Sequence, residues 1–180
     1  AVRKLSRYEP CDLAEPWGLS FLSQTIEKEK PEIIFHLASM AEVKPSFGSP
    51  GRYLDNNIQC TVNLYEAMRA VKSDAICVLA STSEVYGAAP ESDNPITESQ
   101  PFAPVNPYAI SKTTQEHLAQ VYFKSYGIKT VVTRAFGYIN QKRPDLVATA
   151  IARQIVKCEH GAATVVYHGN LTPVRSFCDA

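Results

Sequence analysis

Short apolar runs alternate with segments of helical periodicity along most of the chain. The apolar runs predict β-strands at 32–37, 75–80, 129–134 and 163–167. Apolar residues that recur every three or four positions predict helices that contain 19–26, 54–68 and 147–155. Strands that are apolar along their length and separated by helices are typical of a parallel sheet with helices on both faces. The pattern therefore predicts an α/β fold with a doubly wound parallel sheet.

A longer helix is predicted to begin near Tyr108. Asn106 can cap its N-terminus, and Pro107 suits the first helical turn. We expect its apolar side chains to face the core, namely Ile110, Leu118, Val121 and Tyr122. The preceding residues 88–107 contain five prolines in twenty positions, which predicts a loop over the surface.

Composition narrows the class of protein. Lys and Arg number 18 and Asp and Glu number 18 in 180 residues, so the formal charge is zero. A balanced charge argues against a protein that binds nucleic acid or an anionic membrane through bulk charge. The five cysteines include no CxxC pair, and the histidines show no metal-ligand spacing. We therefore expect a soluble cytoplasmic protein with no metal, no nucleic-acid partner and no membrane segment.

No GxGxxG or GxxGxxG turn occurs in the sequence. A dinucleotide-binding fold normally begins with a strand, such a turn and a helix whose N-terminus receives the pyrophosphate. We therefore expect the chain to be a fragment of a longer enzyme, truncated at both ends and lacking the glycine-rich loop. A catalytically silent fragment remains an alternative to a working enzyme.

The strongest chemical signal is the YxxxK pair of Tyr108 and Lys112. Residues four apart lie on the same face of a helix. A neighbouring ammonium stabilises a phenolate, so this pair is suited to general acid and base catalysis. The pattern is weak when it stands alone, because most such pairs are solvated on a helix surface.

A second signal is the hydroxyl-rich turn at 81–87, which directly follows the predicted strand 75–80. Ligands of parallel sheets bind beyond the carboxyl ends of the strands. The turn contains Thr82, Ser83 and the carboxylate of Glu84. Hydroxyl groups at a strand end often serve only as caps, but a turn of this kind 26 residues before a YxxxK helix is much rarer than either feature alone.

In this order and spacing, the chain resembles the extended short-chain dehydrogenase/reductase family, and within it the nucleotide-sugar epimerases and dehydratases. The resemblance runs from about Cys11 to Asp179. The matching pieces are Asp12-Leu13, His36-Leu37-Ala38-Ser39, Asn57, the turn 81–87, Asn106-Pro107-Tyr108 with Lys112, Thr133-Arg134, and Gly169-Asn170-Leu171 with Val174-Arg175. The stretch 43–47 and the segment 169–175 look most like the GDP-mannose branch, which holds 4,6-dehydratases and 4-keto reductases.

The resemblance implies a Rossmann-like NAD(P)-binding region at 1–136 and the start of a sugar-nucleotide-binding region at 137–180. It implies that Tyr108 exchanges a proton with the sugar 4-hydroxyl, that Lys112 holds the nicotinamide ribose, and that Thr82 hydrogen-bonds the sugar O4. The implied cofactor contacts are Asp12, Leu13, Leu37, Ala38, Ser39, Tyr108 and Lys112. The implied substrate contacts are Ser83 and Arg175.

Glu84 bears on the reaction type. By the resemblance, a 4,6-dehydratase needs a carboxylate here to remove the C5 proton, whereas an epimerase tends to have a non-acidic residue. A 4-keto reductase can also carry a glutamate nearby, so dehydratase, reductase and epimerase all stay open, with the GDP-mannose dehydratase favoured. The choice between NAD and NADP is open as well.

The resemblance also implies a homodimer or homotetramer. Relatives pair through the YxxxK helix and the helix before it. The candidate faces in this chain are therefore 54–70 and 108–126.

Overall fold

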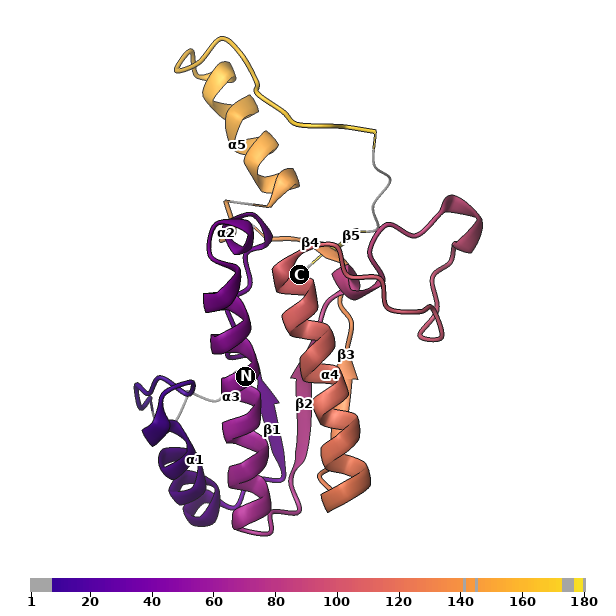
Figure 1. The fold of residues 1–180 in the computed structure, drawn as a ribbon. Coiled ribbons are helices and arrows are strands. Elements are labelled where there is room, and N and C mark those ends of the chain that lie inside the picture. The colour runs from indigo at the N-terminus through magenta and orange to yellow at the C-terminus, as the bar shows by residue number, and fades with distance from the viewer. Residues whose placement is uncertain (1–7, 141, 145, 173–176, 180) are drawn as a thin grey trace. The chain divides into compact units, whose positions relative to one another are not determined.

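The computed structural model describes residues 8–140, 142–144, 146–172 and 177–179 (Figure 1). The chain divides into two compact units, with the boundary between Ala135 and Phe136. Its helices are α1 (Pro16–Glu29), α2 (Val43–Gly48), α3 (Pro50–Ala70), α4 (Pro107–Tyr126) and α5 (Val147–Glu159), with short 3₁₀ helices η1 (Ser83–Tyr86) and η2 (Glu91–Asp93). No helix in the described part of the chain has the length and apolar character that a bilayer span requires.

The first unit is built on a three-stranded parallel sheet. Its strands are β1 (Ile33–His36), β2 (Ile76–Ala80) and β3 (Thr130–Thr133), in the order β1-β2-β3. Parallel neighbours need a crossover, and α3 and α4 provide the crossovers from β1 to β2 and from β2 to β3. This arrangement confirms the predicted α/β class and three of the four predicted strands.

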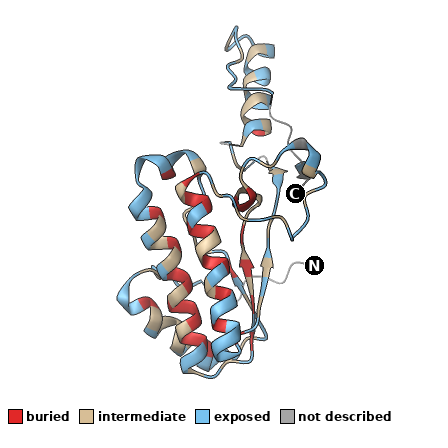
Figure 2. Cartoon of the chain, turned by 45° about the vertical axis from the view of Figure 1, so that its right-hand side comes forward, coloured by how far each residue is buried: buried red, intermediate tan, exposed pale blue. Residues whose placement is uncertain are grey.

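The hydrophobic core lies between the sheet and the helices α3 and α4, whose facing sides carry most of the buried residues (Figure 2). Leu64, Tyr65 and Met68 of α3 are at most 2% exposed, as are Cys77 and Leu79 of β2. The alternation in β2 follows from the two-residue period of a strand, which turns every second side chain toward the helices.

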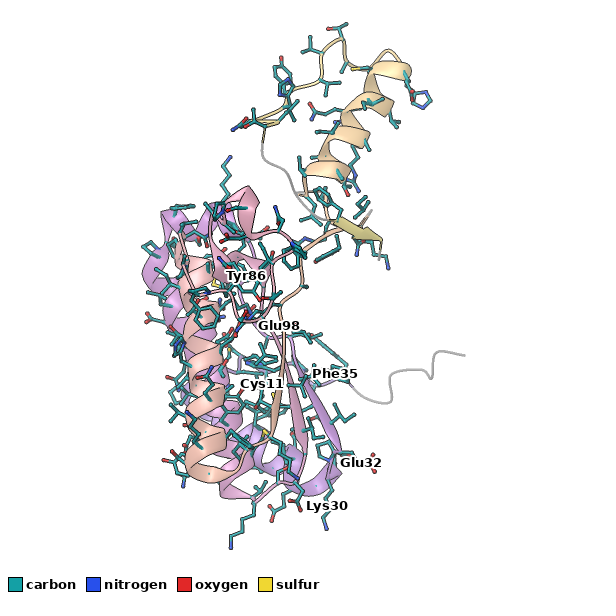
Figure 3. All side chains as sticks on the ribbon, turned by 90° about the vertical axis from the view of Figure 1, so that its right-hand side faces the viewer. Cys11, Lys30, Glu32, Phe35, Tyr86 and Glu98 are labelled. Carbon is teal, nitrogen blue, oxygen red and sulfur yellow. The ribbon has the colours of Figure 1, made fainter. Side chains whose placement is uncertain are left out.

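The opposite face of the sheet is apolar and exposed in the described structure. Ile33, Phe35 and Leu37 are 51%, 66% and 69% exposed, and Val131 is 53% exposed. Phe35 pairs in register with Val78, and Val78 with Val131, so these side chains form one continuous patch. Phe35 lies on the side of the sheet away from α4 (Figure 3). This differs from the expectation of helices on both faces, although the apolar residues of that face are those that a covered sheet would need.

Helix α4 begins as predicted but turns a different face to the core. Asn106 caps it, because its Oδ1 accepts a hydrogen bond from the Ala109 amide at 2.8 Å. Tyr122 is buried, and Leu118 packs against the core. The prediction for Ile110 and Val121 is wrong, since they are 45% and 53% exposed. Ser111 and Gln115, on another side of the helix, occupy the buried face instead.

The second unit contains β4 (Gly137–Ile139), the helix α5 and β5 (Phe177–Asp179), and β4 pairs in parallel with β5. The strand predicted at 163–167 is wrong, because no strand forms there. The Gln154 side chain binds the Tyr167 backbone instead: its Nε2 donates to the Tyr167 carbonyl at 3.0 Å and its Oε1 accepts from the Tyr167 amide at 2.8 Å. At Tyr167 the backbone hydrogen bonds are thus made to a side chain rather than to a neighbouring strand.

The apolar patch on the sheet predicts that the 180-residue chain self-associates and binds hydrophobic dyes. The variant Phe35→Glu should lower dye fluorescence and the associated fraction about two-fold or more, because it places a charge at the centre of the patch. The measurements are dye binding and sedimentation velocity. As a control, Phe47→Glu changes an equally exposed phenylalanine in α2 and should have little effect. A monodisperse wild-type chain that binds no dye would contradict the prediction.

Candidate active site

Helix α4 places Tyr108 and Lys112 together at its N-terminal end. The Lys112 Nζ lies 5.8 Å from the centre of the Tyr108 ring. Tyr108 is 8% exposed and Lys112 is 3% exposed. Burial of both residues rules out the alternative of a solvated surface pair.

The Lys112 ammonium is tied to the end of β2. Its Nζ donates a hydrogen bond of 2.8 Å to the carbonyl of Ala80, the last residue of that strand. Burial lowers the pKa of Lys112 to about 8, and the nearby Cys60 and Glu116 partly oppose this shift. The pair therefore sits at the carboxyl edge of the sheet, where ligands of parallel sheets bind.

The backbone of the turn that follows β2 is constrained at both of its ends. Thr82 caps η1, because its Oγ1 accepts from the Glu84 amide at 3.2 Å. Gly87 ends the turn at a φ of +65°, and a Cβ atom there would lie 2.0 Å from the Ala103 carbonyl oxygen. Position 87 therefore needs a glycine. Its absent side chain lets the proline-rich loop pass close to the turn at Ala103.

Glu84 is joined to the start of α4 by one amide side chain. The Asn106 Nδ2 donates to the Glu84 Oε2 at 3.1 Å, while the same side chain caps α4. The turn with Thr82, Ser83 and Glu84 therefore adjoins the helix with Tyr108 and Lys112. The structure brings the four predicted catalytic residues onto two neighbouring elements.

An ion pair between the buried Glu116 and the half-buried Arg134 links these elements to the end of β3. The Arg134 guanidinium binds the Glu116 carboxylate through Nε and Nη2, with the shortest contact at 2.7 Å. Its Nη1 donates to the Tyr86 hydroxyl at 2.9 Å and to the Glu98 carbonyl at 3.2 Å, and Tyr86 and Glu98 are labelled in Figure 3. The Ser81 hydroxyl also donates to Glu116.

Sequence reasoning noted Arg134 only as part of the resemblance and missed Glu116. The signal for Glu116 was its position four residues after Lys112 on the same helix, which places it beside the YxxxK pair. A carboxylate that is 2% exposed needs a charged partner in the fold, and the burial that reveals this need is not visible in sequence.

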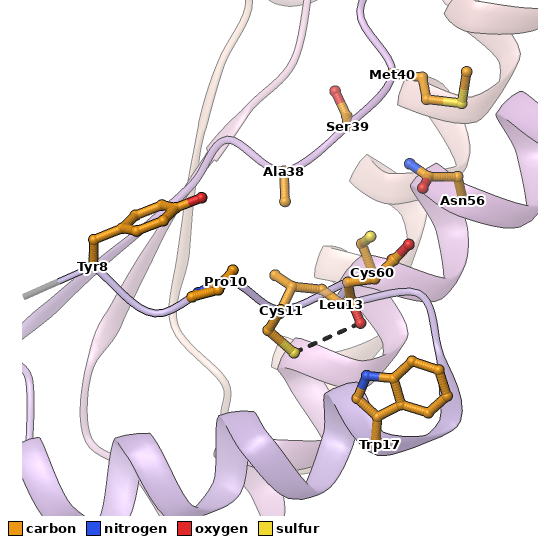
Figure 4. A pocket seen from close by; sticks show the side chains of 11 residues that line it. Tyr8, Pro10, Cys11, Leu13, Trp17, Ala38, Ser39, Met40, Asn56 and Cys60 are labelled. Atoms are coloured by element: carbon orange, nitrogen blue, oxygen red, sulfur yellow. Dashed lines mark hydrogen bonds between the residues drawn. The ribbon is translucent and has the colours of Figure 1, made fainter.

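Four predicted cofactor contacts gather around one cleft of about 640 Å³ (Figure 4). Asp12, Leu13, Ala38 and Ser39 line it. The other lining residues are Tyr8, Pro10, Cys11, Trp17, Met40, Asn56 and Cys60. Of the remaining predictions, Leu37 is outside this lining and 69% exposed, Ser83 is half-buried in η1, and Arg175 lies outside the described residues.

The wall of the cleft is fixed to α4 through Asn57. The Asn57 amide accepts from the Met40 amide at 2.7 Å and donates to the Met40 carbonyl at 3.1 Å. Its Nδ2 also donates to the Ser111 hydroxyl of α4 at 2.9 Å. Sequence reasoning noted Asn57 in the resemblance without giving it this role.

The lining of the cleft fits an adenine nucleotide such as the adenosine half of NAD or NADP. The exposed ring of Trp17 offers a stacking surface for a purine. The Asp12 carboxylate can accept hydrogen bonds from a ribose or an adenine, although its Oδ1 already accepts from the Ala14 amide. Asp12, Leu13, Ala38 and Ser39 would hold this part of the cofactor, while Lys112 lies on α4.

The chain matches the family described as GDP-mannose 4,6 dehydratase over residues 9–180. It is 36% identical over 131 residues to the dTDP-glucose 4,6-dehydratase of Neisseria meningitidis, a match that covers 68% of this chain and 35% of the relative. It is 33% identical over 170 residues to the GDP-6-deoxy-D-mannose reductase of Pseudomonas aeruginosa, covering 93% of this chain and 55% of that enzyme.

A solved structure of RMD from Pseudomonas aeruginosa in complex with NADPH has a TM-score of 0.84 and 31% identity to this chain. The match covers 95% of this chain and 57% of that one. This neighbour confirms the Rossmann-like fold class. The chain spans only about a third to just over half of the length of these relatives.

The buried Lys112 predicts a specific dependence of stability on pH. Its pKa of about 8 in the folded chain lies below the usual 10.5. Between these values the unfolded chain binds more protons, so the free energy of unfolding should rise with pH, by up to about 3 kcal/mol. The variant Lys112→Met should lack this rise and should be about 1–2 kcal/mol more stable at pH 7, after loss of the Ala80 hydrogen bond.

The measurement is denaturant unfolding of the 180-residue chain between pH 7 and pH 10.5. Lys124→Met is the matched control, because Lys124 lies exposed on the same helix. Equal pH slopes for the wild type and Lys112→Met would show that the ammonium carries no burial penalty.

The cleft can be tested through Trp17, the single tryptophan of the chain. We expect ADP to quench its fluorescence with a dissociation constant on the order of 1 mM, since the sequence contains no glycine-rich turn to bind the diphosphate. Ala38→Asp should abolish the quenching, because it places a negative charge in the cleft. Ala162→Asp, an exposed position in the second unit, serves as the control. Quenching that persists unchanged in Ala38→Asp would place ADP elsewhere.

Proposed function

The chain belongs to the GDP-mannose 4,6-dehydratase family of nucleotide-sugar dehydratases, epimerases and reductases, and we propose that its site serves an NAD(P)-dependent 4,6-dehydration with GDP-mannose as substrate. One observation carries this proposal. A carboxylate, Glu84, is held in the turn after β2 next to the buried Tyr108 and Lys112 pair. A dehydratase needs an acid–base group for C4 and a second base for C5, and this arrangement offers both.

A bound nicotinamide would supply the redox chemistry by accepting a hydride from C4 and returning it at C6. Tyr108 acts as a phenolate, which the Lys112 ammonium beside it stabilises. It takes the proton of the 4-hydroxyl as the C4–H bond breaks and becomes a neutral phenol. Thr82, which caps η1 at the same edge, would hydrogen-bond the sugar O4. Ser83, in the same turn, would contact the substrate.

Glu84 acts in the second stage. Oxidation at C4 acidifies the proton at C5, and the Glu84 carboxylate removes it. The electron pair of the C5–H bond forms the C5–C6 double bond as the 6-hydroxyl leaves, and the Glu84 proton accompanies it, so water is released. When the double bond is reduced, C5 regains a proton, and the net change is the loss of one water.

A 4-keto reductase is the second candidate, because the Pseudomonas aeruginosa relative of that kind matches 93% of this chain. Tyr108 and Lys112 would then work in the opposite direction, with Tyr108 donating a proton to O4 of a 4-keto sugar. Glu84 does not exclude this reaction. The two candidates differ in whether NAD(P)H is consumed in proportion to product.

We also propose a homodimer that involves α4. Ile110 and Val121 are exposed apolar residues of the helix that the family resemblance implies for pairing. A second copy that packed there would cover both side chains.

The cytoplasmic location stays a prediction of the sequence.

The test uses the full-length protein with GDP-mannose and catalytic amounts of NAD or NADP. We expect a product that has lost one water, with no net change in cofactor. Glu84→Gln should retain cofactor reduction in a single turnover but slow dehydration by about 10²- to 10⁴-fold, because the base is gone. Tyr108→Phe should block both stages.

The readouts are mass spectrometry of the sugar nucleotide and absorbance at 340 nm. Consumption of one NAD(P)H for each 4-keto sugar, without dehydration of GDP-mannose, would favour the reductase. No reaction with either substrate would refute both assignments.

A further inference from the structure

Asn106 has two different partners on the two ends of one amide. Its Oδ1 accepts from the Ala109 amide at 2.8 Å, and its Nδ2 donates to the Glu84 Oε2 at 3.1 Å. Asn106 itself is 4% exposed, so the amide has little freedom to turn toward solvent. It precedes Tyr108 by two residues, and therefore stands between the candidate base and the candidate acid–base pair.

The orientation of this amide follows from its partners. A backbone N–H can only donate, so the atom that faces Ala109 must be the Asn106 oxygen. The NH₂ group must then face Glu84, and it can only donate. The amide therefore fixes the position of Glu84 Oε2 as a hydrogen-bond acceptor.

We propose that Asn106 is a positioning residue that aims the Glu84 carboxylate at C5 of the substrate. The inference rests on the proposed dehydratase function and adds to it a residue that touches neither substrate nor cofactor. Among the described contacts, the Thr82 hydroxyl accepts from the backbone amide of Glu84 and so holds the Glu84 backbone. Asn106 instead holds the Glu84 carboxylate. With Oε2 anchored, Oε1 is the oxygen left to face the substrate.

The capping role and the positioning role can be separated by substitution. Serine caps helices about as well as asparagine does, but its short side chain cannot also reach Glu84. Asn106→Ser should therefore leave α4 and its Tyr108–Lys112 pair in place while it releases the carboxylate. Asn106→Asp should also keep the cap, but it places an acceptor where Glu84 needs a donor.

In the full-length enzyme, Asn106→Ser should reduce the cofactor in a single turnover at a rate within about two-fold of wild type. Dehydration, and the exchange of the C5 proton with solvent deuterium, should fall about 10- to 100-fold, because a hydrogen bond to a charged group is lost. Reduced cofactor and the 4-keto intermediate should accumulate. Asn106→Asp should lose at least as much dehydration.

A purely structural role predicts a different result. It would slow cofactor reduction and dehydration by the same factor and lower the melting temperature of Asn106→Ser by several degrees. That outcome would overturn the proposal. If the wild-type enzyme reduces no cofactor with GDP-mannose, the proposed function is refuted instead. The contact between Asn106 and Glu84 is then tested by the following measurement.

The contact itself can be measured in the full-length protein by nuclear magnetic resonance. Glu84→Ala should move the side-chain NH₂ resonances of Asn106, because their acceptor is removed, and should leave the Ala109 amide close to its wild-type position. Asp93→Ala, in η2 of the same loop region, is the control and should move neither. Unchanged Asn106 NH₂ resonances in Glu84→Ala would overturn the proposal even if the enzyme proves to be a dehydratase.

Discussion

The ion pair between Arg134 and Glu116 is the contact on which the site geometry depends. Glu116 is 2% exposed, and a charge at that depth is tolerated only with a strong partner. Arg134 supplies the partner from the end of β3, and Ser81 adds a hydrogen bond from the end of β2. The pair thereby joins α4 to the two strands whose ends form the site. Loss of Arg134 would leave the buried Glu116 charge unpaired, which typically costs about 3–5 kcal/mol, and it would also remove the Tyr86 contact of the turn after β2.

A second buried network sets the register of α3 against α4. The His36 imidazole pairs with the Thr61 hydroxyl at 2.8 Å, and the Gln115 Nε2 donates to the same hydroxyl at 2.6 Å. Burial and the Lys112 charge lower the pKa of His36 to about 4, so its ring is neutral at pH 7. A neutral ring can pair with a hydroxyl without adding charge beside Lys112. His36 is thus a buried histidine whose ring has a hydrogen-bond partner in the core.

Sequence reasoning was accurate where local chemistry determines the structure and failed where a distant partner does. The cap at Asn106 and the three strands of the first unit follow from the residues within each segment and were confirmed. The exposure of Ile110 and Val121 could not be read from periodicity, because the core beside α4 accepts polar residues such as Gln115. The contact of Gln154 with the Tyr167 backbone, at the end of the predicted strand 163–167, joins residues 13 apart and could not be read from the apolar run.

In the proposed reaction, the two kinds of chemistry fall on two kinds of structure. Tyr108 and Lys112 are buried on a 20-residue helix that the core and the Glu116 ion pair hold rigidly. Glu84 lies in a four-residue 3₁₀ turn, and its carboxylate is held by one amide. Proton exchange at O4 is common to dehydration and 4-keto reduction, whereas removal of the C5 proton belongs to dehydration alone. Under the proposed function, a change within the turn would alter the reaction while leaving the helix intact.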